Sequence, residues 1–146
     1  MQGVNRMKVY IAAPFFSESQ LETVKKIETL LTDYDIEFFS PRSEGTLKDM
    51  APDERKAAMS GIFESNIKHM DWCTHSIAVI DDYDTGTIWE MGYMFHAGKE
   101  IVTYSDMYHG INVMLNESIS YHATNISMLV DGLLGNVASE KTGDVF

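Results

Sequence analysis

Four acidic residues surround a Thr-Gly-Thr turn near the middle of the chain. They are Asp81, Asp82, Asp84 and Glu90, and they stand in the stretch DDYDTGTIWEMGYMFHAGK, residues 81–99. The residues after the turn are mostly apolar, and a carboxylate buried among apolar groups is costly unless its charge is paired or hydrogen-bonded. Either this cluster therefore lies in water, or at least one of its carboxylates has a chemical role.

Glu90 has the position best suited to catalysis. The sequence predicts a strand over residues 76–81 and a helix over residues 87–98, so Glu90 falls in about the first turn of that helix. Free backbone N–H groups and the helix dipole stabilise a carboxylate there. Glu90 is either a nucleophile at the mouth of a sheet or a helix-start glutamate that serves only the dipole.

The three aspartates end the predicted strand. They form either a solvated loop or a group that holds ligand hydroxyls or a metal ion. A metal is disfavoured because no His or Cys stands at ligand spacing. Gly86 indicates a tight turn, and the sequence DTGT lacks both the lysine of a P-loop and the spacing of a GxGxxG motif. We expect neither a metal nor a cofactor.

Tyr10, Phe15, Phe16 and Asn66 are further candidates. A tyrosine in a core strand needs a hydrogen-bond partner, which is Glu90 unless Tyr10 only packs. The two phenylalanines follow a predicted strand and either cover the core or stack on a planar base. Asn66 shares the apolar face of a predicted helix, where it bonds either a backbone group or a ligand.

Strands and helices alternate along the chain. Short apolar runs predict strands over residues 7–13, 36–41, 76–81, 99–105 and 119–122. Apolar residues at helical spacing predict helices over residues 17–31, 53–73, 87–98, 111–119 and 125–135. This order predicts an α/β fold, a doubly wound sandwich around a parallel sheet of about five strands.

Ligands bind such sheets at the carboxyl ends of the strands. Those ends are residues 12–16, 40–45, 81–90 and 104–114. The polar connection over residues 42–56 is long, and long connections are often functional.

The composition fits one globular domain over residues 1–146, with residues 1–6 as a loose leader. A net charge of -11 disfavours a nucleic-acid partner. The single cysteine, Cys73, precludes an internal disulfide and fits a reducing compartment. No apolar run is long enough to span a bilayer, and the start lacks a signal peptide, so we expect a cytoplasmic protein without a membrane partner.

Five sequence blocks, in order, resemble the nucleoside 2-deoxyribosyltransferase family. They are KVYIAAPFFSESQ, FFSPRSE, IFESNIKHMDWCTHSIAVID, DTGTIWEMGY and INVML, and they cover most of residues 8–121. The resemblance implies a flavodoxin-like fold and transfer of 2-deoxyribose between nucleobases through a covalent glycosyl–enzyme ester. It implies ping-pong kinetics, slow hydrolysis as a side reaction and a role in nucleotide salvage. The implied partners are deoxynucleosides and free nucleobases.

The resemblance also implies roles for single residues. Glu90 matches the nucleophile, Asp84 the acid that holds the sugar hydroxyls, and Tyr10 the tyrosine that positions the nucleophile. Asn112 and Met114 match residues that reach a neighbouring subunit's site, which implies a homo-oligomer with shared active sites. The expected substrate-binding residues are Ala12, Phe15, Phe16, Gly86, Asn112 and Met114.

Asn66 departs from the family pattern, which usually has an aspartate there. An amide hydrogen-bonds a base but exchanges no proton at neutral pH, so the departure concerns the rate, the base preference or the proton route. Two alternatives to transfer stay open. One is a hydrolase of deoxynucleoside 5-monophosphates, which the repulsion between Asp84 and a phosphate disfavours. The other is a non-catalytic nucleoside or nucleotide sensor on the same fold.

Overall fold

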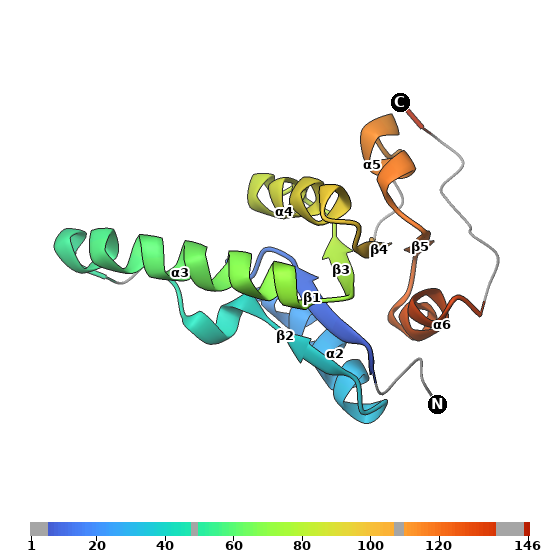
Figure 1. Ribbon diagram of the computed structural model, residues 1–146, viewed down its shortest axis with the longest axis horizontal. Helices are drawn as coiled ribbons and strands as arrows, with labels where there is room; N and C mark the ends of the chain where they lie inside the picture. The colour runs from blue at the N-terminus through green and yellow to red at the C-terminus, as the bar shows by residue number, and fades with distance from the viewer. Residues whose placement is uncertain (1–5, 48–49, 107–109, 137–144) are drawn as a thin grey trace.

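The computed structural model describes residues 6–47, 50–106, 110–136 and 145–146, so residues 1–5 of the predicted leader and most of the tail lie outside the described residues. Its centre is one parallel sheet in the strand order β2-β1-β3-β4-β5 (Figure 1). The strands are β1 (Lys8–Ala12), β2 (Glu37–Phe39), β3 (His75–Val79), β4 (Glu100–Tyr104) and β5 (Tyr121–Ala123). The predicted α/β fold with a five-stranded parallel sheet is confirmed.

Helices cover both faces of the sheet (Figure 1). One face packs against α2 (Glu18–Asp33) and α6 (Leu129–Leu134). The other face packs against α3 (Pro52–Trp72) and α4 (Thr85–His96), and α5 (Val113–Ser118) packs beside α4. Two short 3-10 turns complete the described elements, η1 (Pro41–Glu44) and η2 (Ile126–Met128). The predicted last helix is thus divided into η2 and α6, and it ends as expected at Gly135, whose φ is 69°.

The central strands β1 and β3 are buried on both faces over all but their first residues, which is why they are mostly apolar. In β1, Val9 and Ile11 lie in the core under α2 and α6, whereas Tyr10 and Ala12 lie in the core under α3 and α4. This alternation was predicted from the period of two residues in a strand. It decides the chemistry of the site, because it places the Tyr10 side chain beside α4.

The predicted capping box fixes the start of α2. Ser17 Oγ accepts from the backbone N–H of Gln20, and Gln20 Oε1 accepts from the backbone N–H of Ser17. The side-chain amide of Gln20 also donates to Asp82 at 2.8 Å. The loop after β1 is therefore tied to the loop after β3, so that two carboxyl ends of the sheet are held together.

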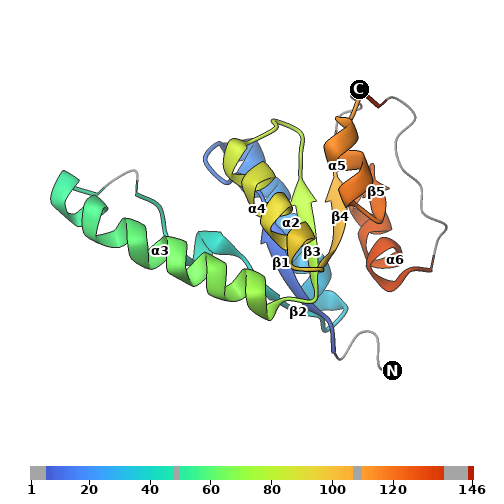
Figure 2. The same cartoon turned by 45° about the horizontal axis from the view of Figure 1, so that its top comes forward.

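The long helix α3 begins at Pro52, a residue suited to the first turn of a helix. Its C-terminal half lies along the sheet, whereas its N-terminal half extends beyond the rest of the molecule (Figure 2). Within the part of the chain that the structure describes, no helix is long and apolar enough to cross a membrane.

Candidate active site

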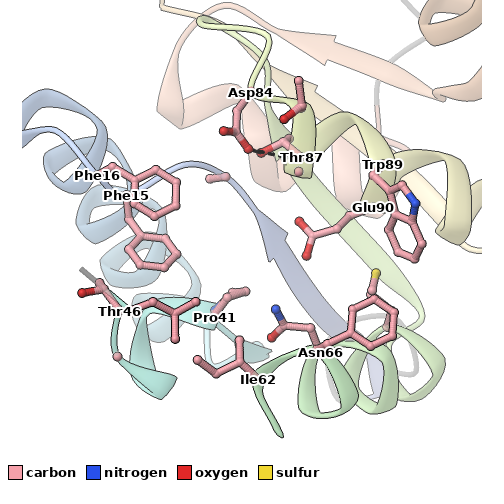
Figure 3. Close-up of a pocket in the computed structure, with 17 residues that line it drawn as sticks. Phe15, Phe16, Pro41, Thr46, Ile62, Asn66, Asp84, Thr87, Trp89 and Glu90 are labelled. Atoms are coloured by element: carbon pink, nitrogen blue, oxygen red, sulfur yellow. Dashed lines mark hydrogen bonds between the residues drawn. The ribbon is translucent and has the colours of Figure 1, made fainter. Parts of the chain in front are cut away.

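A cavity of about 690 Å³ opens at the carboxyl ends of β1, β2 and β3. Its walls come from the loop after β1, η1 and the connection after it, the middle of α3, and the first turns of α4 (Figure 3). Three of the predicted ligand edges thus meet in one cavity, and so does the long polar connection, which contributes Thr46 and Leu47. The fourth edge, residues 104–114, contributes no lining residue among its described positions. The reason is that α4 lies between the end of β4 and the cavity.

Glu90 is one wall of this cavity and is paired with Tyr10. The Tyr10 hydroxyl, on a fully buried side chain, donates a hydrogen bond of 2.5 Å to Glu90 Oε2. The Tyr10 ring is held from its other side by Phe39, with 5.8 Å between the ring centroids. The prediction that Glu90 is the partner of Tyr10 is confirmed.

Burial controls the protonation of this pair. Desolvation raises the pKa of Glu90 to about 7, the hydrogen bond from Tyr10 opposes this rise, and the negative charge of Asp84 adds to it. Burial and the charge of Glu90 raise the pKa of Tyr10 far above its usual value, so Tyr10 remains a donor. The carboxyl group of Glu90 is therefore divided between its neutral and ionised forms near neutral pH.

The predicted position of Glu90 within its helix was wrong. The helix α4 begins at Thr85, not Thr87, and Asp84 is its N-cap. Glu90 consequently stands in the second turn, beyond the free N–H groups of the helix start. Its carboxylate is held by Tyr10 and not by the helix N-terminus.

Asp84 has a structural partner and a free oxygen. Asp84 Oδ2 accepts from the backbone N–H of Thr87 at 2.9 Å and from Thr87 Oγ1 at 3.1 Å. A Cβ atom at Gly86 would lie only 3.2 Å from Asp84 Oδ2, a close contact that a side chain there would have to relieve. In the described part of the chain no donor reaches Oδ1, so this oxygen is available to a ligand at the cavity wall.

The other two aspartates of the acidic stretch are used within the fold. Asp81 accepts from Ser105 Oγ at 2.6 Å and from the backbone N–H of Asp106 at 2.8 Å. Asp82 accepts from Gln20. Neither aspartate lines the cavity, so the acidic stretch divides into two residues that join loops and two that face the cavity.

Two aromatic rings form the wall opposite Glu90 (Figure 3). Phe15 and Phe16 have ring centroids 4.8 Å apart with an interplanar angle of 32°, and Phe16 is exposed. Ala12 lies beneath this wall and is fully buried, and it is the next residue, Ala13, that lines the cavity.

Asn66 points into the cavity from α3, on the same side as Glu90 (Figure 3). Its Oδ1 atom is buried, and no hydrogen-bond donor in the described residues reaches it. Within the described residues Oδ1 thus makes no bond to a backbone group, and contact between Asn66 and a ligand remains a prediction. Asn66 and Met70 lie on one face of α3, and only part of that face packs in the core. Met70 is buried there, whereas Phe63 on the same face is exposed.

Sequence reasoning did not nominate Phe63 and Trp89, although both line the cavity. Their ring centroids are 6.0 Å apart, so α3 and α4 meet through this pair. The available signals were the three-residue spacing from Phe63 to Asn66 and the position of Trp89 beside Glu90. Apolar residues at helical spacing are ordinarily core residues, which is why these two were passed over.

Asn112 and Met114 lie away from the cavity, in a smaller pocket of about 310 Å³ on the other side of α4. Asn112 caps α5 by accepting from the backbone N–H of Met114 at 2.8 Å. Met114 is 73% exposed, and Phe146 beside it is 68% exposed. Neither Asn112 nor Met114 completes the cavity of its own chain, and the expectation that they serve a neighbouring subunit remains a prediction.

The cavity contains no lysine or arginine among its described lining residues. Among the described residues, no three His, Cys, Asp or Glu side chains are grouped so that they could hold a metal ion.

The family model for nucleoside 2-deoxyribosyltransferase matches residues 9–133. The chain belongs to this family. The family acts on nucleosides and nucleobases, and its sequence match spans all the segments that build the cavity.

Solved structures agree with this assignment. A 2-deoxyribosyltransferase from the psychrotolerant bacterium Bacillus psychrosaccharolyticus has a TM-score of 0.76 and 27% identity, covering 92% of this chain and 98% of that one. A CMP N-glycosidase of Clostridium botulinum has a TM-score of 0.50 and 16% identity, covering 89% of this chain and 99% of that one, which shows the fold alone.

A curated relative from Ureaplasma parvum, an uncharacterized protein, is 27% identical over 104 residues. The match covers 66% of this chain and 64% of the relative, so it spans somewhat less than two thirds of the relative's length. The family model and the 2-deoxyribosyltransferase structure therefore agree on the family and on the fold.

Proposed function

We propose that this chain transfers 2-deoxyribose between nucleobases through a covalent ester on Glu90, with slow hydrolysis as a side reaction. The observation that carries the proposal is the buried Tyr10–Glu90 pair in the wall of a cavity of nucleoside size. With a pKa raised to about 7, Glu90 is ionised in a sizeable fraction of molecules at neutral pH yet poorly solvated. A poorly solvated carboxylate is a competent nucleophile.

In the first half-reaction Glu90 attacks the anomeric carbon. Tyr10 holds Oε2, which leaves Oε1 to form the new bond while the bond to the base breaks. The transition state resembles an oxocarbenium ion, as in retaining glycosidases. In the second half-reaction another base attacks the ester from the opposite side. Two inversions give net retention and ping-pong kinetics.

The remaining cavity residues orient the substrate. Asp84 Oδ1 accepts from hydroxyl groups of the sugar, because Oδ2 is engaged by Thr87. The rings of Phe15 and Phe16 stack against the base on the wall opposite Glu90. A 2-hydroxyl group would destabilise the oxocarbenium ion and need its own partner, so deoxynucleosides are the preferred donors.

A base-exchange assay tests the proposal. Deoxyinosine and adenine are incubated with the protein, and the products are separated by chromatography. New deoxyadenosine is the expected product, and the Glu90→Ala variant should form almost none of it while keeping its fold. Failure to form a new deoxynucleoside from any pair of donor and base, or more than a few per cent of activity in the variant, contradicts the proposal.

The same assay distinguishes the two alternatives. Free hypoxanthine without deoxyadenosine indicates a hydrolase, and no change indicates a sensor. A hydrolase of 5-monophosphates is the weaker candidate, because the described cavity wall offers Asp84 and Glu90 but no cationic side chain for a phosphate.

A homo-oligomer with shared sites is part of the proposal. Four exposed apolar residues lie at or next to the small pocket: Val113, Met114, Val145 and Phe146. In an oligomer another subunit would bury them. Cys73 is free and buried, which fits a protein of the reducing cytoplasm. In that compartment base exchange would serve nucleotide salvage.

A further inference from the structure

The cavity wall lacks an evident acid for the leaving base. Its described lining residues include only two carboxyl groups, those of Asp84 and Glu90. Glu90 is the nucleophile of the proposed function, and Asp84 caps α4. Asn66 points into the same space, but an amide does not give up a proton.

This arrangement restricts the bases that can leave. When the bond between the anomeric carbon and the base breaks, its electron pair stays on the base. A neutral base leaves as an anion unless a positioned acid protonates it, and such general acids contribute about 100-fold to 10,000-fold in rate. A base that already carries a positive charge leaves as a neutral molecule and needs no acid.

The electrostatics of the cavity favour a cationic base. Phe15, Phe16, Phe63 and Trp89 present aromatic rings to it, and aromatic faces attract cations. The two carboxyl groups add negative charge, no described lining residue is a lysine or arginine, and the whole chain carries a net charge of -11.

Asn66 supplies an acceptor for such a base. Its buried Oδ1 has no donor within the described chain, and an unpaired buried acceptor is costly. The N–H groups of a positively charged purine are stronger donors than those of the neutral base, and hydrogen bonds that involve a charged partner are the stronger ones.

On the basis of the proposed function, we infer that the preferred donor is a deoxynucleoside whose base is already cationic, of the class of N7-alkylated purines. In the first step the bond from Glu90 Oε1 to the anomeric carbon forms and the bond from that carbon to N9 breaks. The released electron pair cancels the charge of the imidazole ring, and the alkylated base leaves neutral without proton transfer. Water or a second base then resolves the ester.

Comparison of 7-methyl-2′-deoxyguanosine with 2′-deoxyguanosine tests the inference. The rate of base release is measured for wild type, Asn66→Asp and Glu64→Gln, and the rate without enzyme is subtracted. Glu64→Gln is the control, because Glu64 lies on the exposed side of α3. The kcat/KM of wild type should favour the methylated donor by about 100-fold or more. Asn66→Asp introduces an acid and should lower this ratio by about 100-fold, whereas Glu64→Gln should keep it.

A second measurement needs no variant at Asn66. Across a series of neutral deoxynucleosides, kcat/KM of the wild type should fall steeply as the leaving base becomes more basic. A shallow dependence, or an equal methyl preference in wild type and Asn66→Asp, overturns the inference while leaving the proposed function intact. Absence of cleavage with every deoxynucleoside, the methylated one included, overturns the proposed function and the inference with it.

Discussion

The Tyr10 hydroxyl donates a 2.5 Å hydrogen bond to Glu90 Oε2 and so joins β1 to α4 across 80 positions of the sequence. The bond is possible because alternate residues of β1 face opposite sides of the sheet, which places Tyr10 under α4. It fixes one oxygen of the carboxyl group and leaves the other directed to the cavity. It also opposes the rise in the pKa of Glu90 that burial causes.

Tyr10→Phe should therefore shift the pH dependence of the reaction. Loss of the hydrogen bond removes the contribution that lowers the pKa of Glu90, so the carboxyl group ionises at higher pH. The rising limb of kcat/KM against pH, which we place near pH 7 in the wild type from the pKa of Glu90 in the free protein, should move upward. A pH profile with an unmoved limb would show that Tyr10 does not influence the nucleophile.

Glu90→Gln should stabilise the fold, and increasingly so as pH rises. Burial raises the pKa of Glu90 from 4.5 to about 7, so the folded chain keeps a proton that the unfolded chain loses between these values. The resulting contribution of Glu90 to the free energy of unfolding is fully present below pH 4.5. It is lost as pH rises through about 7, and the total loss is about 3 kcal/mol. Glutamine does not titrate.

Urea denaturation of wild type and Glu90→Gln over this pH range measures the difference in free energy of unfolding. The difference should grow in favour of the variant by about 3 kcal/mol. Glu64→Gln removes an exposed carboxyl group of α3 and is the control. A difference independent of pH would mean that Glu90 titrates equally in both states.

Asp84 has two functions that a pair of substitutions separates. Asp84→Asn keeps a side chain that caps α4 but removes the charge that raises the pKa of Glu90, so the limb in kcat/KM should move to lower pH. Asp84→Ala removes the cap too and should cost about 1 kcal/mol of stability. Both should raise KM for the deoxynucleoside. An unchanged KM in both variants would exclude Asp84 from sugar binding.

Met114→Glu should dissociate the oligomer that we propose. Met114 is 73% exposed beside the small pocket, and a charge there disfavours burial against another subunit. Sedimentation should show smaller particles, and the activity per chain should fall. Lys68→Glu, on the exposed side of α3, is the control. A fully active monomeric variant would contradict the shared site.

The sequence was sufficient for the sheet, because buried parallel strands and capped helices have clear local signals. Ser17 and Gln20 gave the start of α2, and the alternation in β1 led to the Tyr10–Glu90 pair. The start of α4 was placed too late because Thr85, Gly86 and Thr87 have low helix propensity. The cap by Asp84 outweighs that propensity.

Other parts of the site depend on long-range packing. The packing of α3 against α4 decides whether Phe63 and Trp89 face the core or a cavity. The spacing of residues within each helix does not predict how the two helices pack. The separation of Asn112 from the cavity likewise follows from α4 lying between them.

Trapping of the glycosyl–enzyme ester tests the central claim most directly. The protein is mixed with a deoxynucleoside in the absence of acceptor base, quenched with acid, digested and analysed by mass spectrometry. The account predicts the mass of one deoxyribosyl group on the peptide that contains Glu90, and no such mass in Glu90→Gln. Full base exchange together with a deoxyribosyl group on another residue would contradict it.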